Sequence, residues 1–136
     1  SNDVGMVTIG FRTTEFSYYD KGLMFNNLKS STEELGNKDA LEYIQKRIST
    51  DNIMRKLHEI DSSDRYDDLK EIAYTDLTES IEQQIESKWT NLNELDVFIA
   101  GGTALNMNFN TYPVVEDSQM ITAKGLWLVA LSRFAG

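Results

Sequence analysis

The sequence predicts a single mixed α/β domain of 136 residues. Three observations support this fold class. The first third of the chain carries short runs rich in β-branched and aromatic residues, which favour strands. The middle repeats apolar residues at helical spacing, and the last third contains a short apolar segment that ends in two glycines. With 40% hydrophobic and 26% charged residues, the composition is that of an ordinary soluble globular domain.

Three strands are predicted near the N-terminal end, over residues 4–9, 13–19 and 23–28. Residues 20–22 (Asp-Lys-Gly) form a turn signal between the second and third, because glycine readily adopts positive φ. Three consecutive strands with short connections predict an antiparallel meander.

The middle of the chain is predicted to be helical and acidic. Residues 31–34 (Ser-Thr-Glu-Glu) have the chemistry of a helix start, and a helix is expected to bury Leu41, Ile44 and Ile48. Residues 49–51 (Ser-Thr-Asp) can cap a second helix, whose apolar face would carry Ile53, Leu57 and Ile60. Residues 61–64 form a polar break before the next helix.

A long helix is expected from about residue 66 to 89. Its stripe at i, i+4 spacing consists of Leu69, Ala73, Leu77, Ile81, Ile85 and Trp89. The last third then predicts a strand over 96–100 and a helix beginning after the paired glycines, over 103–107. The only proline, Pro113, suggests a strand start or edge within 112–115, and a largely apolar helix over 118–134 is expected to pack on the sheet.

Composition excludes several functions. The chain has no cysteine and one histidine, His58, so disulfides, cysteine nucleophiles and multi-histidine metal sites are ruled out, and His58 is expected to be an ordinary surface residue. A net charge of −9 argues against direct nucleic-acid binding. No apolar run is long enough to span a membrane and no signal peptide opens the chain, so we expect a cytoplasmic protein.

The first candidate site is the glycine turn between the first two predicted strands. It contains Gly10, Arg12, Thr13 and Thr14. Backbone N–H groups at such a turn can converge on an anion, and the threonine hydroxyls can add donors. The alternative is a plain hairpin, which often contains a glycine and threonines.

The second candidate site is the turn Gly101-Gly102-Thr103, which joins a buried strand to a helix start. Glycines allow a flat ligand to lie against the backbone, and a helix N-terminus favours anions. The alternative is that the glycines serve packing only. The turn is neither a dinucleotide-binding GxGxxG motif nor a P-loop.

Taken together and in this order, the two turns resemble the second half of the actin, sugar-kinase and heat-shock-chaperone superfamily, which has a ribonuclease-H-like, actin-like ATPase fold. The matching motifs are residues 8–15 (Thr-Ile-Gly-Phe-Arg-Thr-Thr-Glu), residues 99–104 (Ile-Ala-Gly-Gly-Thr-Ala) and residues 123–125 (Ala-Lys-Gly). The strand meander, the short helical insertion and the long helix before the paired glycines are most similar to ParM-type plasmid-segregation actins. The resemblance covers nearly the whole chain.

The resemblance implies the C-terminal half of a filament-forming ATPase, comprising residues 4–136 with a helical insertion at about 38–65; Ser1 and Asn2 look like a tag remnant. ATP and Mg²⁺ would be the cofactors, and this half would supply no metal ligands of its own. The partners would be other filament subunits, the N-terminal half of the same protein and an adaptor protein, without direct nucleic-acid or membrane contact. Phosphate contacts are implied for Gly10, Arg12, Thr13 and Thr14, and adenosine contacts for Gly101, Gly102 and Thr103.

Two residues depart from the family pattern. Thr8 stands where the family usually has an aspartate that organises magnesium and the attacking water, and Thr103 replaces a third glycine. No catalytic residue is therefore assigned. Because phosphoryl transfer needs charge from both sides of the phosphate chain, the chain by itself is not expected to hydrolyse ATP. The alternatives are half of another ATPase or kinase of the superfamily, and a free-standing interaction module that has lost the chemistry.

Overall fold

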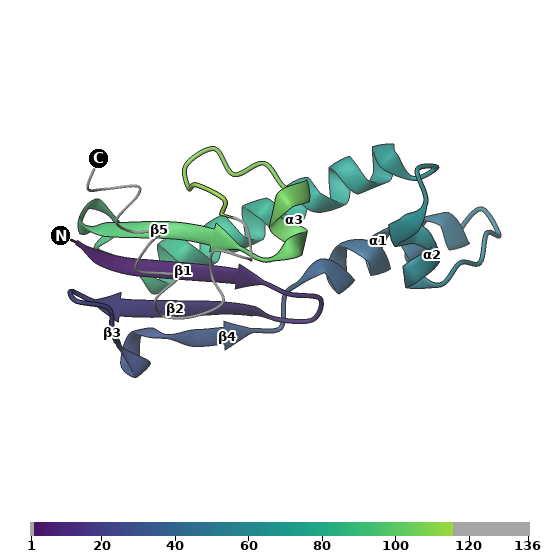
Figure 1. Cartoon of the computed structure of the whole chain (residues 1–136). Coiled ribbons are helices and arrows are strands. Elements are labelled where there is room, and N and C mark those ends of the chain that lie inside the picture. Colours follow the sequence, from purple (N-terminus) through teal and green to yellow (C-terminus); the bar gives the residue numbers. More distant parts are fainter. Residues whose placement is uncertain (1, 116–136) are drawn as a thin grey trace.

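The computed structural model describes residues 2–115 of the chain. Within this range a mixed sheet is covered on one face by helices (Figure 1). The expected helix over 118–134, the Ala-Lys-Gly step at 123–125 and Trp127 lie outside the described residues.

The sheet has the order β3-β2-β1-β5, with β4 paired to β2. Its strands are β1 (Asp3–Ile9), β2 (Thr14–Asp20), β3 (Met24–Phe25), β4 (Ser31–Glu33) and β5 (Leu95–Ala100). The β1–β2 and β2–β3 pairs are antiparallel, which confirms the predicted meander. The pairing of β1 with β5 is parallel, and it runs in register from Asp3 beside Leu95 to Thr8 beside Ala100.

Two sequence predictions are wrong in the segment after β2. The third strand is shorter than expected, because the side chain of Asn26 accepts from the Lys29 N–H and caps the 3₁₀ helix η1 (Asn27–Lys29). Residues 31–34 do not begin a helix: Ser31–Glu33 form β4, whose backbone pairs with Thr14 to Phe16 of β2. Pairing with a neighbouring strand outweighs the local preference of Ser, Thr and Glu for a helix start.

The helices are α1 (Asn37–Ser49), α2 (Leu57–Ser62) and α3 (Asp67–Lys88), with the 3₁₀ helices η2 (Leu92–Glu94) and η3 (Gly102–Asn106). The expected cap of the second helix at 49–51 is wrong. Those residues end α1, and α2 starts after Lys56, whose N–H donates to the Glu59 carboxylate. Ile53 consequently lies in the exposed connection and not on a buried face.

The helix α3 runs along one face of the sheet, and α1 packs on α3 beyond the carboxyl ends of the strands (Figure 1). Ala40, Leu41, Ile44 and Ile48 of α1 pack with the expected stripe of α3, of which Leu69 is only partly buried. Trp89 follows α3 and is 2% exposed, as expected of a core residue. Side chains alternate between the two faces of a strand. The opposite face therefore carries a different cluster, comprising Val4, Met6, Phe98, Ala100 and Val115.

The segment around Pro113 lies beside β5 without forming a full strand. Val114 makes an isolated parallel bridge with Ile99, supported by hydrogen bonds from the Ile99 N–H to the Pro113 carbonyl (2.9 Å) and from the Val115 N–H to the Ile99 carbonyl (2.8 Å). Proline accepts here and needs no N–H, in agreement with the expected edge position. Among the described helices, none is both long and apolar enough to cross a bilayer.

Candidate functional site

The two glycine turns meet at one cavity of about 520 Å³. Gly10 lines it from the first turn, and Gly101 and Gly102 line it from the second. Its remaining wall comes from β1, β2 and β5, mainly from the face of the sheet that none of the described helices covers: Met6, Thr8, Ile9, Glu15, Ser17, Tyr19 and Ala100. The structure thus brings together the two segments that the sequence singled out.

The parallel pairing of β1 with β5 is what joins the turns. Because Thr8 lies beside Ala100, both strands end at the same edge of the sheet. Figure 1 shows the two arrowheads side by side, next to the start of α1. The chain leaves β1 into Gly10 and leaves β5 into Gly101. Open α/β sheets bind ligands outside the carboxyl ends of their strands, and the cavity occupies this position.

The first turn is a four-residue hairpin, Gly10 to Thr13, that rests on the N-terminus of α1. The Gly10 N–H donates to the Thr13 carbonyl (2.9 Å). On the other side, the Asn37 N–H donates to the Gly10 carbonyl (3.0 Å) and the Lys38 N–H to the Phe11 carbonyl (2.7 Å). The first N–H groups of a helix have no partner within the helix, and here the hairpin carbonyls satisfy two of them.

This docking orients the N–H groups of the hairpin. In a trans peptide the C=O and N–H point in opposite directions, and the chain has no cis peptide among its described residues. The carbonyls of Gly10 and Phe11 point toward α1, so the N–H groups of Phe11 and Arg12 point away from it. Phe11 and Arg12 do not line the cavity themselves, but they directly follow Gly10, which does.

The second turn requires glycine. Gly101 has φ +106°, a conformation that side chains rarely adopt, and a Cβ there would lie 2.2 Å from the carbonyl oxygen of Ile9. Gly102 follows as the first residue of η3 and is exposed. The backbone of β5 therefore reaches the cavity with no side chain at two consecutive positions.

The other predicted site residues, unlike the glycines, do not line the cavity. Arg12 is exposed, and Thr13 and Thr103 are half-buried beside the two turns without lining the cavity. The Thr14 side chain is fully buried, and its hydroxyl donates to the Leu35 carbonyl (2.5 Å), so in this structure the hydroxyl serves the core. Ser17 was not predicted from the sequence. Its alternation with Glu15 on β2 would have placed both on the cavity face.

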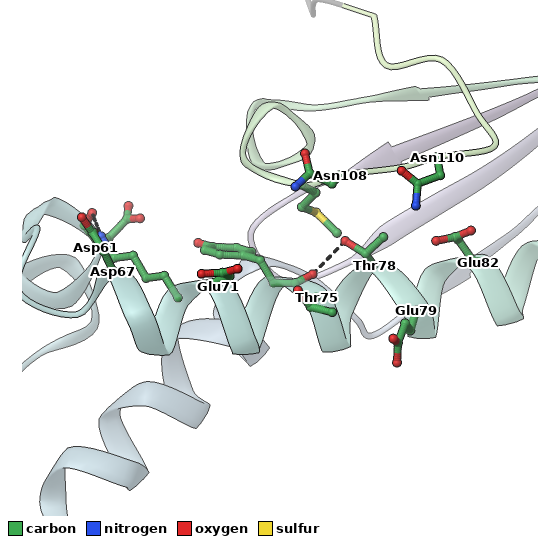
Figure 2. A pocket seen from close by; sticks show the side chains of 12 residues that line it. Asp61, Asp67, Glu71, Thr75, Thr78, Glu79, Glu82, Asn108 and Asn110 are labelled. Atoms are coloured by element: carbon green, nitrogen blue, oxygen red, sulfur yellow. Dashed lines mark hydrogen bonds between the residues drawn. The ribbon is translucent and has the colours of Figure 1, made fainter.

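A second cavity, of about 610 Å³, runs along α3. Figure 2 shows Asn108 and Asn110 facing the helix across it. Its lining includes five carboxylates, from Asp61, Asp67, Glu71, Glu79 and Glu82. Among the described residues of its wall the one lysine is Lys70, which donates to the carbonyls of Asp61 (3.1 Å) and Ser63 (2.6 Å). Such a surface repels phosphate groups, so the cavity at the glycine turns is the better candidate for an anionic ligand.

Tyr74 lines this second cavity along α3 and also contacts α1. Burial, together with the nearby Asp61 carboxylate, raises the pKa of Tyr74 to about 12, so its hydroxyl stays protonated at neutral pH. That hydroxyl donates a short hydrogen bond to Oδ1 of Asn37. Nowhere in residues 2–115, this cavity included, is a group of three His, Cys, Asp or Glu side chains arranged to hold a metal ion.

Replacing Gly36 with alanine tests how closely the hairpin rests on α1. A Cβ at this position would lie 2.6 Å from both the Gly10 and the Phe11 carbonyl oxygens, which belong to backbone and cannot move cheaply. We expect the variant to lose about 2 kcal/mol or more of unfolding free energy, measured by urea denaturation. Lys38→Ala, which keeps its backbone donor, should stay within about 0.5 kcal/mol. Equal stability of the two variants would contradict the close docking.

Comparison with known proteins defines the class of fold. No protein-family model and no curated protein matches the chain. Several solved structures are similar to the chain. The chain is similar to the archaeal actin homologue Ta0583, with a TM-score of 0.75 and 14% identity over 97% of this chain and 49% of that one. It is also similar to the apo ParM protein of psk41, with a TM-score of 0.70 and 18% identity over 100% of this chain and 44% of that one.

A 15-stranded ParM filament from Clostridium botulinum is a third similar structure, with a TM-score of 0.68 and 19% identity over 98% of this chain and 46% of that one. The described chain therefore has an actin-like fold, and the predicted fold class is confirmed. The chain spans about half the length of the solved proteins that it resembles.

Proposed function

We propose that this chain is the nucleotide-binding C-terminal half of an actin-like, filament-forming ATPase that segregates plasmid DNA. The observation that carries the proposal is the meeting of Gly10 with Gly101 and Gly102 at one cavity, at the carboxyl ends of two parallel strands. The volume of about 520 Å³ lies within the range of small-molecule sites. One of the similar structures, Ta0583, is in complex with ADP.

The hairpin is the proposed phosphate site. The N–H groups of Phe11 and Arg12 point away from α1 and directly follow Gly10, which lines the cavity; two neighbouring backbone donors of this kind can form an anion-binding concavity. The guanidinium of Arg12 is exposed and free to turn toward a phosphate group. Thr13 adds a hydroxyl at the same turn, whereas the contribution of Thr14 is limited to its backbone.

Gly101, Gly102 and Thr103 are the proposed adenosine site. The absence of side chains at the two glycines leaves a surface on which the nucleoside can lie. Thr8, Glu15 and Ser17 line the cavity with hydroxyl and carboxylate oxygens. Mg²⁺ would be held by the phosphates and water, since this half is expected to supply no metal ligand of its own. The magnesium ion would neutralise charge that develops on the phosphates.

The ATPase would need the N-terminal half of the protein as well. The cavity offers donors from one side of a phosphate chain, whereas phosphoryl transfer needs positioned charge from both. The 136-residue chain by itself is accordingly expected to turn over ATP negligibly.

Filament formation in the cytoplasm, with an adaptor linking the filament to plasmid DNA, completes the proposal. It is supported by the ParM filament among the similar structures. The helical insertion, residues 38–65, presents three exposed apolar side chains that suit a contact between subunits: Tyr43, Ile53 and Met54, of which Met54 is 78% exposed.

The test is nucleotide binding by the full-length protein, measured with a fluorescent ADP analogue. Gly102→Val places a branched side chain in the cavity at an exposed position, so we expect at least about tenfold weaker ADP binding with little change in stability. Leu28→Ala, at a 96% exposed site on η1, should bind as the unmodified protein does.

Light scattering then tests assembly: scattering should rise on addition of ATP and Mg²⁺, and less so for the Gly102 variant. If the unmodified protein binds neither ADP nor ATP, the nucleotide-binding function is wrong. An interaction module that has kept the fold without the chemistry would then be the better account.

A further inference from the structure

A hydrogen-bonded connection links the long helix α3 to the hairpin. Tyr74 projects from α3, is 8% exposed, and donates through its hydroxyl to Oδ1 of Asn37. Asn37 is the first residue of α1, and its backbone N–H donates to the Gly10 carbonyl. One residue of α1 thus holds α3 through its side chain and the hairpin through its backbone.

We propose that Asn37 and Tyr74 are positioning residues for phosphate binding, which they favour by fixing the start of α1 beneath the hairpin. The inference rests on the proposed function insofar as it takes the hairpin for the phosphate site. Neither side chain lines the cavity at the glycine turns, so both act through the backbone of Gly10 and Phe11.

The geometry explains why the position of α1 matters. The N–H groups of Phe11 and Arg12 are fixed in a direction away from α1 while the preceding carbonyls accept from the N–H groups of Asn37 and Lys38. A peptide that is no longer held can rotate and turn its carbonyl oxygen toward the ligand, which would repel a phosphate.

The start of α1 is held from several directions. Because Gly36 has no side chain, the start of α1 packs directly against the hairpin backbone. The Gly36 N–H donates to the Asp39 carboxylate (2.8 Å) within the first turn. Tyr74 supplies the hydrogen bond from α3. Its hydroxyl is protonated, and so can donate, across the physiological pH range, and the raised pKa extends this range to higher pH.

The test compares ADP with adenosine in the full-length protein carrying Tyr74→Phe, which keeps the buried ring and removes only the hydroxyl. We expect ADP affinity to fall about five- to tenfold, the effect of one hydrogen bond, while adenosine affinity, measured by competition with a fluorescent ADP analogue, stays unchanged. Asn37→Ala should lower ADP affinity in the same way. The double variant should bind ADP no more weakly than whichever single variant has the lower affinity, because both changes remove the same hydrogen bond.

Tyr66→Phe is the matched control, because it removes the hydroxyl of another tyrosine, partly buried at the N-cap of the same helix α3, and should leave both affinities unchanged. Far-UV circular dichroism and urea denaturation verify that each variant is folded. Equal losses of ADP and adenosine affinity would indicate a purely structural role and overturn the inference, as would unchanged ADP affinity. Absence of ADP binding by the unmodified protein would instead overturn the proposed function and this inference with it.

Discussion

Gly101→Ala is expected to lower the unfolding free energy by about 3 to 5 kcal/mol, measured by urea denaturation followed by circular dichroism. Two costs add at this position. The backbone has φ +106°, which costs an L-residue about 1–3 kcal/mol. In addition, the new Cβ would lie 2.2 Å from the Ile9 carbonyl oxygen, so β1 and β5 would have to move apart at the edge where they meet the cavity.

Gly22→Ala separates these two costs. Gly22 also has positive φ, +83°, but no atom lies within 4 Å of the position that its Cβ would take. We therefore expect this control to lose only about 1–2 kcal/mol, the conformational cost by itself. If both variants unfold at the same urea concentration, the close approach of Gly101 to Ile9 adds nothing to the loss of unfolding free energy.

Trp89→Ala is expected to cost about 3–5 kcal/mol of unfolding free energy, because it leaves a cavity in the centre of the core. The indole packs edge-to-face against Phe16 (6.1 Å between ring centroids) and Tyr18 (5.9 Å). Its Nε1–H donates to the Lys29 carbonyl (2.9 Å), which ties the end of α3 to η1. Urea denaturation, followed by circular dichroism, measures the loss.

Gly5 provides the control for this packing. A Cβ on Gly5 would lie 2.6 Å from the indole ring of Trp89, so Gly5→Ala should destabilise the unmodified protein. In the Trp89→Ala background the same change fills vacated space and should cost less by about 1 kcal/mol or more. Additive losses in the double variant would show that the two positions do not compete for this space.

The sequence by itself determined the elements with strong local patterns. Short runs rich in β-branched and aromatic residues predicted β1 and β2, and the apolar run before the paired glycines predicted β5. Apolar residues at every fourth position predicted α3 to within a residue at either end, because a stripe of this period specifies both a helix and its buried face. The two glycine turns were also evident, since their residue types are themselves the signal.

Tertiary structure decided what local preference could not. Ser31–Glu33 became β4 because β2 offers an open edge to pair with, although the same residues can begin a helix. The Thr14 hydroxyl bonds to the Leu35 carbonyl in the core, and only the packing of the two segments reveals this partner.

The site itself depends on contacts between distant segments. Parallel pairing of β1 with β5 brings Gly10 next to Gly101, and the docking of α1 fixes the direction of the hairpin peptides. Neither contact leaves a local pattern, because residues far apart in the chain interact through backbone groups that every residue carries. The sequence therefore identified the glycines, and the tertiary structure decided that they form one site.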